Sequence, residues 1–323
     1  MALHIVRFKD QDDAPPRWGS LEQGAIAPLE LACTSTGELL AHGYHGVKNA
    51  DLVDHERLAL DDVDLLSPIT ESAKVLCQGA NFREHMRDSG MDPDAKSFNL
   101  FFTKSSASIT GPTGGIVKPD HVKLLDYEIE LTLVLGKQTH GPVEITAANL
   151  HEYVAGICIG NDVSARDIQL PQMQFHKGKS YRTFCPLGPV LCLLDKHEMH
   201  YLDQMQLTLK VNGETRQNDN TSAQVFKAPE TLSEYSQIVD FAPGDVLMTG
   251  TPSGCALGVP APAVVKLSAL LPEARKWAIF VRMQQRRPQY LQIGDHMDAT
   301  IASADGQIDL GRQQHVIEGE GRR

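Results

Sequence analysis

Two observations on the sequence predict a mixed, β-rich fold with a small β-rich domain at the N-terminus. Short apolar runs of strand length follow one another between turn residues, as at residues 3–8 and 125–135. Few stretches carry the spacing of apolar residues that marks a long helix, so a doubly wound α/β sheet is not expected. A chain of 323 residues, of which 41% are hydrophobic, can hold one large domain and a smaller one.

The first 70 residues predict the small domain. Their strand-like pieces are residues 3–8, 24–31 and 38–43. A polar, acidic stretch at 51–64 and the pair Ser67-Pro68 then precede the next apolar run. We therefore expect a boundary near residue 70, with domains at 1–70 and 71–323.

The run at residues 125–135 predicts a strand with two glutamates on one face. Side chains alternate along a strand, so Glu128 and Glu130 point the same way, with Cα atoms about 7 Å apart. The other face carries Tyr127, Ile129 and Leu131, and an apolar run follows, so the carboxylates are expected to enter the protein.

A third carboxylate, Asp162, follows the apolar run at 153–159 where a turn begins. Three carboxylates without a nearby Cys or His are typical of a site for a hard cation, Mg²⁺ or Mn²⁺. The alternative is that Glu128 and Glu130 form a solvated strand face and that Asp162 caps a turn. Further along, Asn212-Gly213 predicts a two-residue hairpin between residues 207–211 and 214–217.

Seven blocks of the chain closely resemble the fumarylacetoacetate hydrolase family and run in family order. They are QGANFREH (78–85), FFTKSSASITGP (101–112), DYEIEL (126–131), GNDVSARDIQ (160–169), GKSYRTFCPLGP (178–189), VNGETRQ (211–217) and PGDVLMTGTPSG (243–254). The resemblance implies the family's mixed β-roll fold, a homodimer, and Glu128, Glu130 and Asp162 as metal ligands.

The resemblance also implies that His85 is the catalytic base. Within a short helix His85 and Asp88 would share a face, so that the carboxylate orients the imidazole for activating water. Two residues depart from the family pattern: Phe82 stands where Tyr is common, and Asp88 is shorter than the usual Glu.

Four more residues match family positions around the substrate. Lys179 matches the active-site lysine, which could hold a substrate carboxylate or enolate oxygen. Gln169 and Thr251 match residues that line the substrate cavity, and Lys104 could be a second anion contact or a surface charge at a strand end. Arg166 and Asp167 are interpreted as a structural ion pair under the metal loop.

About thirty residues, near 260–290, depart from the family pattern as an insertion. Within it residues 263–285 are expected to be helical, with a basic end. The segment could be a surface excursion or a dimer-contact helix, or it could be a lid or a specificity element.

The net charge and the distribution of apolar residues exclude some classes of binding partner. A formal charge of −11 argues against nucleic acid and anionic membranes, and no apolar stretch reaches the roughly 18 residues of a membrane helix. The start of the chain lacks the apolar stretch of a secretory signal, and six scattered cysteines are interpreted as reduced core residues of a cytoplasmic protein.

The family resemblance and the site residues named above together predict a Mg²⁺- or Mn²⁺-dependent hydrolase. Its reaction would be cleavage of a C–C bond in a 2,4-dioxo acid of the acylpyruvate or fumarylpyruvate type. His85 would activate water, and the metal with Lys179 would stabilise the enolate. An oxaloacetate-type decarboxylase, or a hydratase or isomerase of 2-oxo-enoic acids, could use the same metal site. A non-catalytic metal-binding protein on this fold is a third class.

Overall fold

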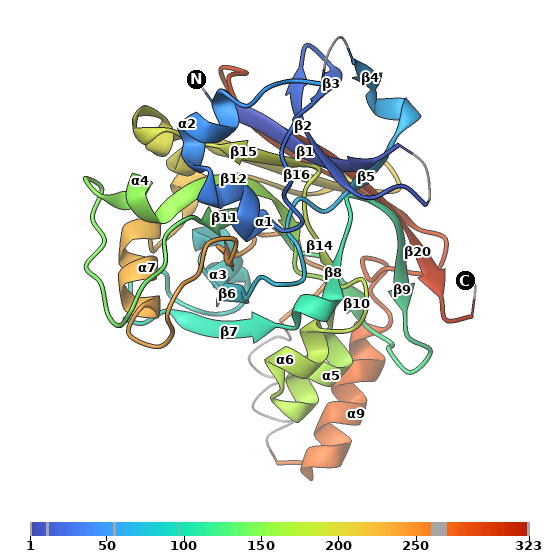
Figure 1. The fold of residues 1–323 in the computed structure, drawn as a ribbon. Helices are drawn as coiled ribbons and strands as arrows, with labels where there is room; N and C mark the ends of the chain where they lie inside the picture. The colour runs from blue at the N-terminus through green and yellow to red at the C-terminus, as the bar shows by residue number, and fades with distance from the viewer. Residues whose placement is uncertain (1, 11–12, 54–55, 96, 260–269, 322–323) are drawn as a thin grey trace.

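Two β-sheets form the frame of the molecule in this computed structural model, which describes residues 2–10, 13–53, 56–95, 97–259 and 270–321 (Figure 1). Within these residues the larger sheet has eleven strands in the order β4-β3-β2-β1-β15-β12-β11-β18-β6-β7, and β5 pairs with β1. Its strands are β1 (Leu3–Lys9), β2 (Arg17–Glu22), β3 (Ala25–Pro28), β4 (Leu58–Ala59), β5 (Asp64–Leu66), β6 (Val75–Gly79), β7 (Leu100–Lys104), β11 (Ile129–Leu135), β12 (Val154–Asn161), β15 (Val190–Leu193) and β18 (Val246–Met248).

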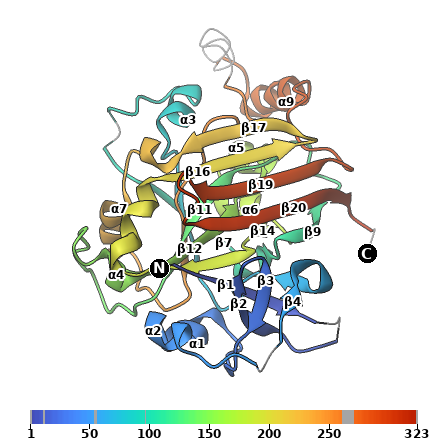
Figure 2. The same cartoon turned by 90° about the horizontal axis from the view of Figure 1, so that it is seen from above.

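The second sheet has five strands in the order β17-β16-β19-β20-β9, seen side by side in Figure 2. They are β9 (Thr113–Lys118), β16 (Met205–Val211), β17 (Glu214–Asn220), β19 (His296–Ser303) and β20 (Asp309–Gly319). The main core lies between the two sheets, where Leu131 and Leu133 of β11 share one apolar cluster with Leu207 of β16 and Ile301 of β19. Two short pairs complete the strands: β10 (Leu125–Asp126) with β13 (Ser164–Ala165), and β8 (Ile109–Thr110) with β14 (Cys185–Pro186).

Short helices lie around the sheets. They are α1 (Thr36–Ala41), α2 (Gly43–Lys48), α3 (Arg83–Asp88), α4 (Leu150–Tyr153), α5 (Arg166–Gln172), α6 (Phe175–Lys179), α7 (Ala228–Tyr235) and α9 (Glu273–Gln284), with the 3-10 turns η1 (Leu60–Asp62), η2 (Ser106–Ser108), η3 (Lys196–Asp203) and η4 (Thr221–Ala223). In Figure 1, α5, α6 and α9 lie together at the end of the molecule opposite the N-terminal strands. Through the described residues the structure has no helix long and apolar enough to cross a membrane.

The predicted β-rich fold is confirmed, and so is the hairpin. Asn212 and Gly213 both have positive φ, of 50° and 81°, and Val211 pairs with Glu214 across the turn. Residues 38–43, predicted as a strand, are instead the end of α1 and the start of α2. The Ser35 hydroxyl accepts a hydrogen bond from the Glu38 N–H and the Glu38 carboxylate caps the N–H of Ser35, so this capping box starts a helix.

The N-terminal residues do not form a sheet of their own. Strand β1 pairs with β15, residue for residue from Leu3 opposite Leu193 to Val6 opposite Val190, so the N-terminal strands extend the larger sheet. The expected boundary near residue 70 falls in the connection between β5 and β6 and stays a prediction. In the expected insertion, α9 is helical from Glu273, while residues 263–269 lie outside the described residues.

Candidate active site

Antiparallel pairing of β11 with β12 brings the three predicted metal ligands together. Glu130 in β11 lies opposite Gly160, and Ile129 lies opposite Asn161, so Asp162, the residue after the end of β12, reaches the level of Glu128. The N–H of Asp162 donates to the carbonyl of Glu128 at 2.8 Å. Carboxylate oxygens of Glu128, Glu130 and Asp162 all lie within 4.8 Å of one another.

The strand expected at 125–135 is interrupted. Residues 125–126 form β10, which pairs with β13, and β11 begins only at Ile129. Glu128 therefore sits in the break between two strands, where its N–H donates to the Asn161 side chain at 3.1 Å. Its carboxylate still faces the same space as that of Glu130, and both residues are buried rather than on a solvated face.

Three cations face the acids. Lys179 Nζ donates to Glu128 at 2.7 Å, to Ser164 Oγ at 2.9 Å, and to Asp162. Lys104 Nζ donates to Asp162 at 2.5 Å and to the carbonyl of Val163 at 3.2 Å. All of these groups are almost completely removed from solvent, so the ion pairs act in a medium of low dielectric.

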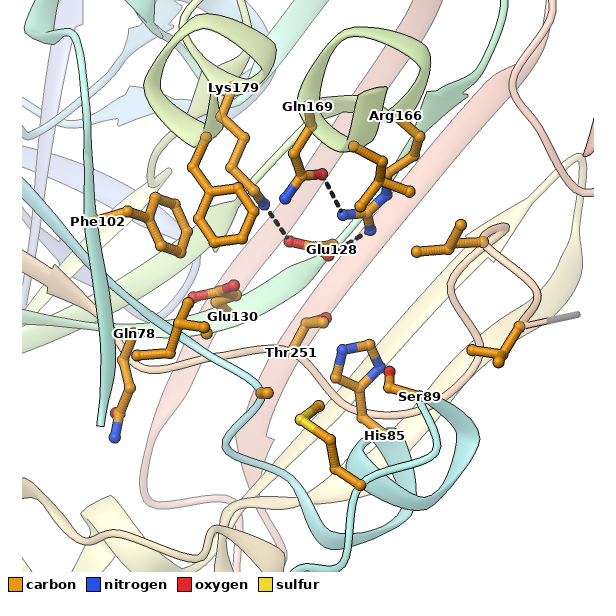
Figure 3. A pocket seen from close by; sticks show the side chains of 18 of the residues that line it. Gln78, His85, Ser89, Phe102, Glu128, Glu130, Arg166, Gln169, Lys179 and Thr251 are labelled. Atoms are coloured by element: carbon orange, nitrogen blue, oxygen red, sulfur yellow. Dashed lines mark hydrogen bonds and ion pairs between the residues drawn. The ribbon is translucent and has the colours of Figure 1, made fainter. Parts of the chain in front are cut away.

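Arg166 is the third cation, and it forms hydrogen bonds to three neighbouring side chains. Its Nε donates to Asp126 at 2.8 Å, and its terminal nitrogens donate to Glu128 and, at 2.9 Å, to the amide oxygen of Gln169 (Figure 3). The interpretation of Arg166 and Asp167 as an ion pair is wrong. The Asp167 carboxylate accepts instead from the backbone N–H groups of Lys123 and Leu124.

Glu130 is the acid that this network leaves without a cation. Among the described residues, four buried carboxylates (Asp126, Glu128, Glu130 and Asp162) face three cations (Lys104, Lys179 and Arg166), and Glu130 accepts only the N–H of Gly250, at 2.8 Å. Gly250 has a φ of +91°, and a Cβ there would lie 2.9 Å from the Cβ of Asn81, so glycine permits this approach. The donor set, three clustered carboxylates with one negative charge uncompensated, fits a hard divalent cation.

The pKa values of Glu128 and Glu130 are shifted in opposite directions. Burial and then the charges of Asp162 and Glu128 raise the pKa of Glu130 well above its usual range. Burial also opposes ionisation of Glu128, but Arg166 and Lys179 outweigh it and lower the pKa of Glu128 to about 2. Glu130 is therefore the position that holds a proton when no metal is bound.

His85 lies on the opposite side of the same cavity. It is presented by α3, and a ring nitrogen of His85 lies within 4.8 Å of a Glu128 oxygen and of the Cys255 sulfur. Burial lowers the pKa of His85 despite the raising effect of Glu128, so the imidazole is neutral near pH 7. Burial also raises the pKa of the Cys255 thiol well above its usual range, so the sulfur remains protonated and is a poor metal ligand.

Asp88 does not orient His85 in this structure. The carboxylate of Asp88 accepts a hydrogen bond from Ser253 Oγ instead. Among the described residues the His85 imidazole has no hydrogen-bond partner, and Asp88 influences its pKa less than Glu128, Arg166 and Asp126 do. The shorter acid noted in the sequence therefore points to the turn at 250–254, and the expected His85–Asp88 pair is not formed.

The side chains predicted to contact the substrate differ in how many of their polar atoms already form hydrogen bonds within the protein. Gln169 is fixed by Arg166 through its amide oxygen, and its amide nitrogen faces the cavity in Figure 3. Thr251 also lines the cavity, but its hydroxyl donates to the Ile129 carbonyl at 2.9 Å and accepts from Gln217 at 2.8 Å. Lys104 faces Asp162 and not a surface, because its side chain is fully buried. An anion-binding role for Lys104 stays a prediction.

Lys179 lines the cavity with all three of its protons committed to protein oxygens. Burial lowers its pKa, but Asp162 and Glu128 outweigh this, and the pKa is raised overall, so the ammonium stays charged. The ring of Phe102 stands 4.9 Å from Nζ. A substrate oxygen would reach Lys179 only by replacing one of these oxygens, for example when a cation binds to the acids.

Two residues that line the cavity were not placed there by the sequence analysis. Arg166 lines the cavity and joins Glu128 to Asp126, which in turn accepts the N–H groups of Ala256 and Leu257 at 2.7 and 3.1 Å. The position of Arg166 in the chain could have indicated its place in the site. Arg166 directly follows β13, and β13 pairs with Leu125–Asp126. Phe280 of α9 also lines the cavity, and no pattern in the sequence placed it there.

Comparison with known proteins identifies the family. A family model described as the C-terminal domain of fumarylacetoacetate (FAA) hydrolase matches residues 74–318, most of the chain. The chain belongs to the fumarylacetoacetate hydrolase family. A second model, described as Rv2993c-like, N-terminal, matches residues 3–68.

Curated relatives carry the name oxaloacetate tautomerase. The mitochondrial protein Fahd2a of Rattus norvegicus is 37% identical over 205 residues, which cover 63% of this chain and 63% of the rat protein. YisK of Bacillus subtilis is 36% identical over 211 residues, which cover 64% of this chain and 68% of that protein. The chain thus spans somewhat less than two thirds of the length of the rat relative.

Solved structures match almost the whole chain. The fumarylacetoacetate hydrolase of Exiguobacterium antarcticum has a TM-score of 0.74 and 28% identity, covering 98% of this chain and 100% of its own. A 2-hydroxyhepta-2,4-diene-1,7-dioate isomerase of Mycobacterium marinum has a TM-score of 0.69 at 24% identity, with 99% and 100% coverage, and shares the fold.

Proposed function

We propose that this protein is a divalent-metal-dependent tautomerase that interconverts the keto and enol forms of oxaloacetate or a related 2-oxo acid. Glu128, Glu130 and Asp162 would hold Mg²⁺ or Mn²⁺. A cation at these acids would act as a Lewis acid on the 2-oxo group. The relatives named oxaloacetate tautomerase support this choice over the hydrolase expected from the sequence.

The observation that carries the proposal is His85 without an acid partner. Hydrolysis of a C–C bond needs a base that activates water, and an oriented imidazole–carboxylate pair would serve that purpose. Here Asp88 is bonded to Ser253, and the neutral His85 instead faces the cavity beside Glu128. A single neutral imidazole is sufficient for tautomerisation, which moves one proton between carbon and oxygen.

The residues of this chain have separate tasks in that reaction. His85 would take a proton from C3 of the keto acid, and the electron pair of the broken C–H bond would move to the 2-oxo oxygen to give an enolate. The positive charges of Lys179 and Arg166 stabilise that oxygen. The proton that His85 has taken from C3 would then pass to this oxygen, which completes the enol and leaves His85 neutral again. The amide N–H of Gln169, held by Arg166, would bind the substrate carboxylate.

A second candidate is the hydrolysis of a 2,4-dioxo acid to pyruvate and a carboxylic acid. The size of the cavity favours it: a volume of about 330 Å³ holds more than a four-carbon diacid. In that reaction Asp88 would have to leave Ser253 and turn towards His85. A homodimer and a cytoplasmic location remain part of the proposal.

The test is a comparison of products. With Mg²⁺ added, we expect the enol absorbance of freshly dissolved oxaloacetate to reach equilibrium faster, without loss of oxaloacetate. In parallel, an acylpyruvate is incubated with the protein; pyruvate is followed by a coupled dehydrogenase and the acid by chromatography. Cleavage of the acylpyruvate, or release of carbon dioxide from oxaloacetate, with no effect on the enol signal would reject the tautomerase. His85→Ala serves as the inactive control.

A further inference from the structure

We propose that the cavity selects 2-oxo acids with an apolar substituent at the end away from the carboxylate, and that Phe280 on α9 sets this selection. The inference deepens the function proposed above and rests on it for the 2-oxo acid end of the ligand. Of the 2-oxo acids named there it favours the related acids with an apolar end, and it makes oxaloacetate, which carries a second carboxylate, the weaker ligand.

The lining of the cavity is divided between the groups already described and a set of apolar side chains. The apolar set includes Leu100, Phe102, Leu170, Phe175, Leu257 and Phe280. They come from segments far apart in the sequence, including α5, α6 and α9, which lie together in Figure 1. These side chains are half-buried, so they leave apolar surface open to a ligand, and contact with an apolar ligand group would remove both surfaces from water.

A second carboxylate on the ligand would find no free hydrogen-bond donor among the described cations that line the cavity. Among the described lining residues the permanently charged cations are Arg166 and Lys179. Each nitrogen of Arg166 already donates to a protein oxygen, and so does every proton of Lys179. At the polar end, the Gln169 amide N–H and a cation at the three acids would receive one carboxylate and its 2-oxo group, whereas a carboxylate at the far end would lose water without gaining a free partner.

Phe280 is held firmly in its place. Gln284, one turn further along α9, donates to the carbonyl of Gly258 at 2.6 Å and accepts from its N–H at 3.2 Å. Arg287 donates to the carbonyl of Ala256 at 2.9 Å. The ring of Trp277 meets that of Phe280 edge-on, with 5.6 Å between ring centroids. A ring fixed by its neighbours offers contact area without a large entropic cost on binding.

The tethers of α9 also fix how Phe280 lies relative to the acids. Ala256 and Leu257, in the loop that α9 holds, donate to Asp126, and Asp126 is paired with Arg166 beside Glu128. The apolar wall and the polar end are thus parts of one connected framework. This favours the specificity element among the alternatives for the insertion.

The test measures binding, so that it does not depend on turnover. Calorimetry in the presence of Mg²⁺ would give the Kd of oxaloacetate, 2,4-dioxopentanoate and 4-phenyl-2,4-dioxobutanoate, whose far ends are a carboxylate, a methyl and a phenyl group. We expect the phenyl compound to bind at least about 10-fold more tightly than oxaloacetate. Phe280→Ala should remove about 10-fold or more of that preference and change oxaloacetate affinity by less than about twofold, whereas Phe280→Leu should keep most of it.

The matched control is Ile279→Ala on the same helix, because Ile279 is 45% exposed and does not line the cavity. This variant should leave all three affinities unchanged, and unfolding midpoints would establish that each variant is folded. Equal weakening of all three ligands by Phe280→Ala, or oxaloacetate binding as tightly as the phenyl compound, would overturn the inference. Selective binding without tautomerisation would instead refute the proposed function alone.

Discussion

Glu130 should release a proton when a divalent cation binds. This carboxylate has no cationic partner in the part of the chain that the structure describes, and burial together with Asp162 and Glu128 raises its pKa well above the usual range. Metal-free protein therefore keeps a proton on Glu130 at pH values where a free carboxyl has lost it. A cation at the three acids must displace that proton, so affinity for the metal rises with pH.

The size of the effect follows from the charge count. One carboxyl changes state, so about one proton should leave for each Mg²⁺ bound, and log Kd should fall by about one for each pH unit. This slope holds from the ordinary carboxyl range up to the raised pKa of Glu130 and then levels off. His85 adds little above neutral pH, because burial lowers its pKa and leaves it neutral.

Titration calorimetry in two buffers of different ionisation enthalpy counts the released protons directly. Glu130→Gln is the perturbation, since it keeps the shape of the side chain and removes the titrating group. We expect this variant to bind Mg²⁺ more weakly and with no proton release that depends on pH. If the wild-type protein binds Mg²⁺ without releasing a proton, or the variant releases as many, the assignment of Glu130 as the protonated ligand fails.

Three further outcomes follow from the same structure. His85→Ala should lower tautomerase turnover by about 10²-fold with Mg²⁺ affinity nearly unchanged, and wild-type turnover would show that another group moves the proton. Asp88→Asn should cost less than about threefold in the same assay, because Asp88 is bonded to Ser253; a loss as large as that of His85→Ala would restore the water-activating pair. Burial lowers the pKa of His315 from 6.5 to about 4, so the unfolded chain binds more protons in that interval and stability present above pH 6.5 is lost as the pH falls towards 4. The loss should approach about 3 kcal/mol and be reduced in His315→Gln, as measured by urea unfolding over that range; identical pH profiles of variant and wild type would contradict it.

The sequence was informative wherever a contact follows from neighbours along a strand. Alternation placed Glu128 and Glu130 on one side, and the end of the next apolar run placed Asp162, because adjacent antiparallel strands bring these positions together. The break after Asp126 was not visible, since every residue from Leu125 to Leu135 is buried and the pattern gives no sign of a change of partner strand.

Contacts between distant segments escaped prediction. Lys104 and Asp162 are separated by 58 residues in the sequence, and Asp88 and Ser253 by 165. No local spacing of residues therefore predicts either pair. The helix at residues 36–41 was missed for a different reason. Its signal was the capping pair Ser35 and Glu38, and the prediction considered only the apolar spacing.

The pairing of β1 with β15 makes the first strand of the chain a structural cover for the family's catalytic part. A fragment that began at residue 71 would leave the backbone of Val190–Leu193 unpaired along one side, on a strand whose side chains are all buried in the intact protein. Such an open, apolar edge invites pairing with other chains. Residues 3–9 therefore protect the sheet from aggregation, and the two matched segments of this protein are expected to be expressed well together and poorly apart.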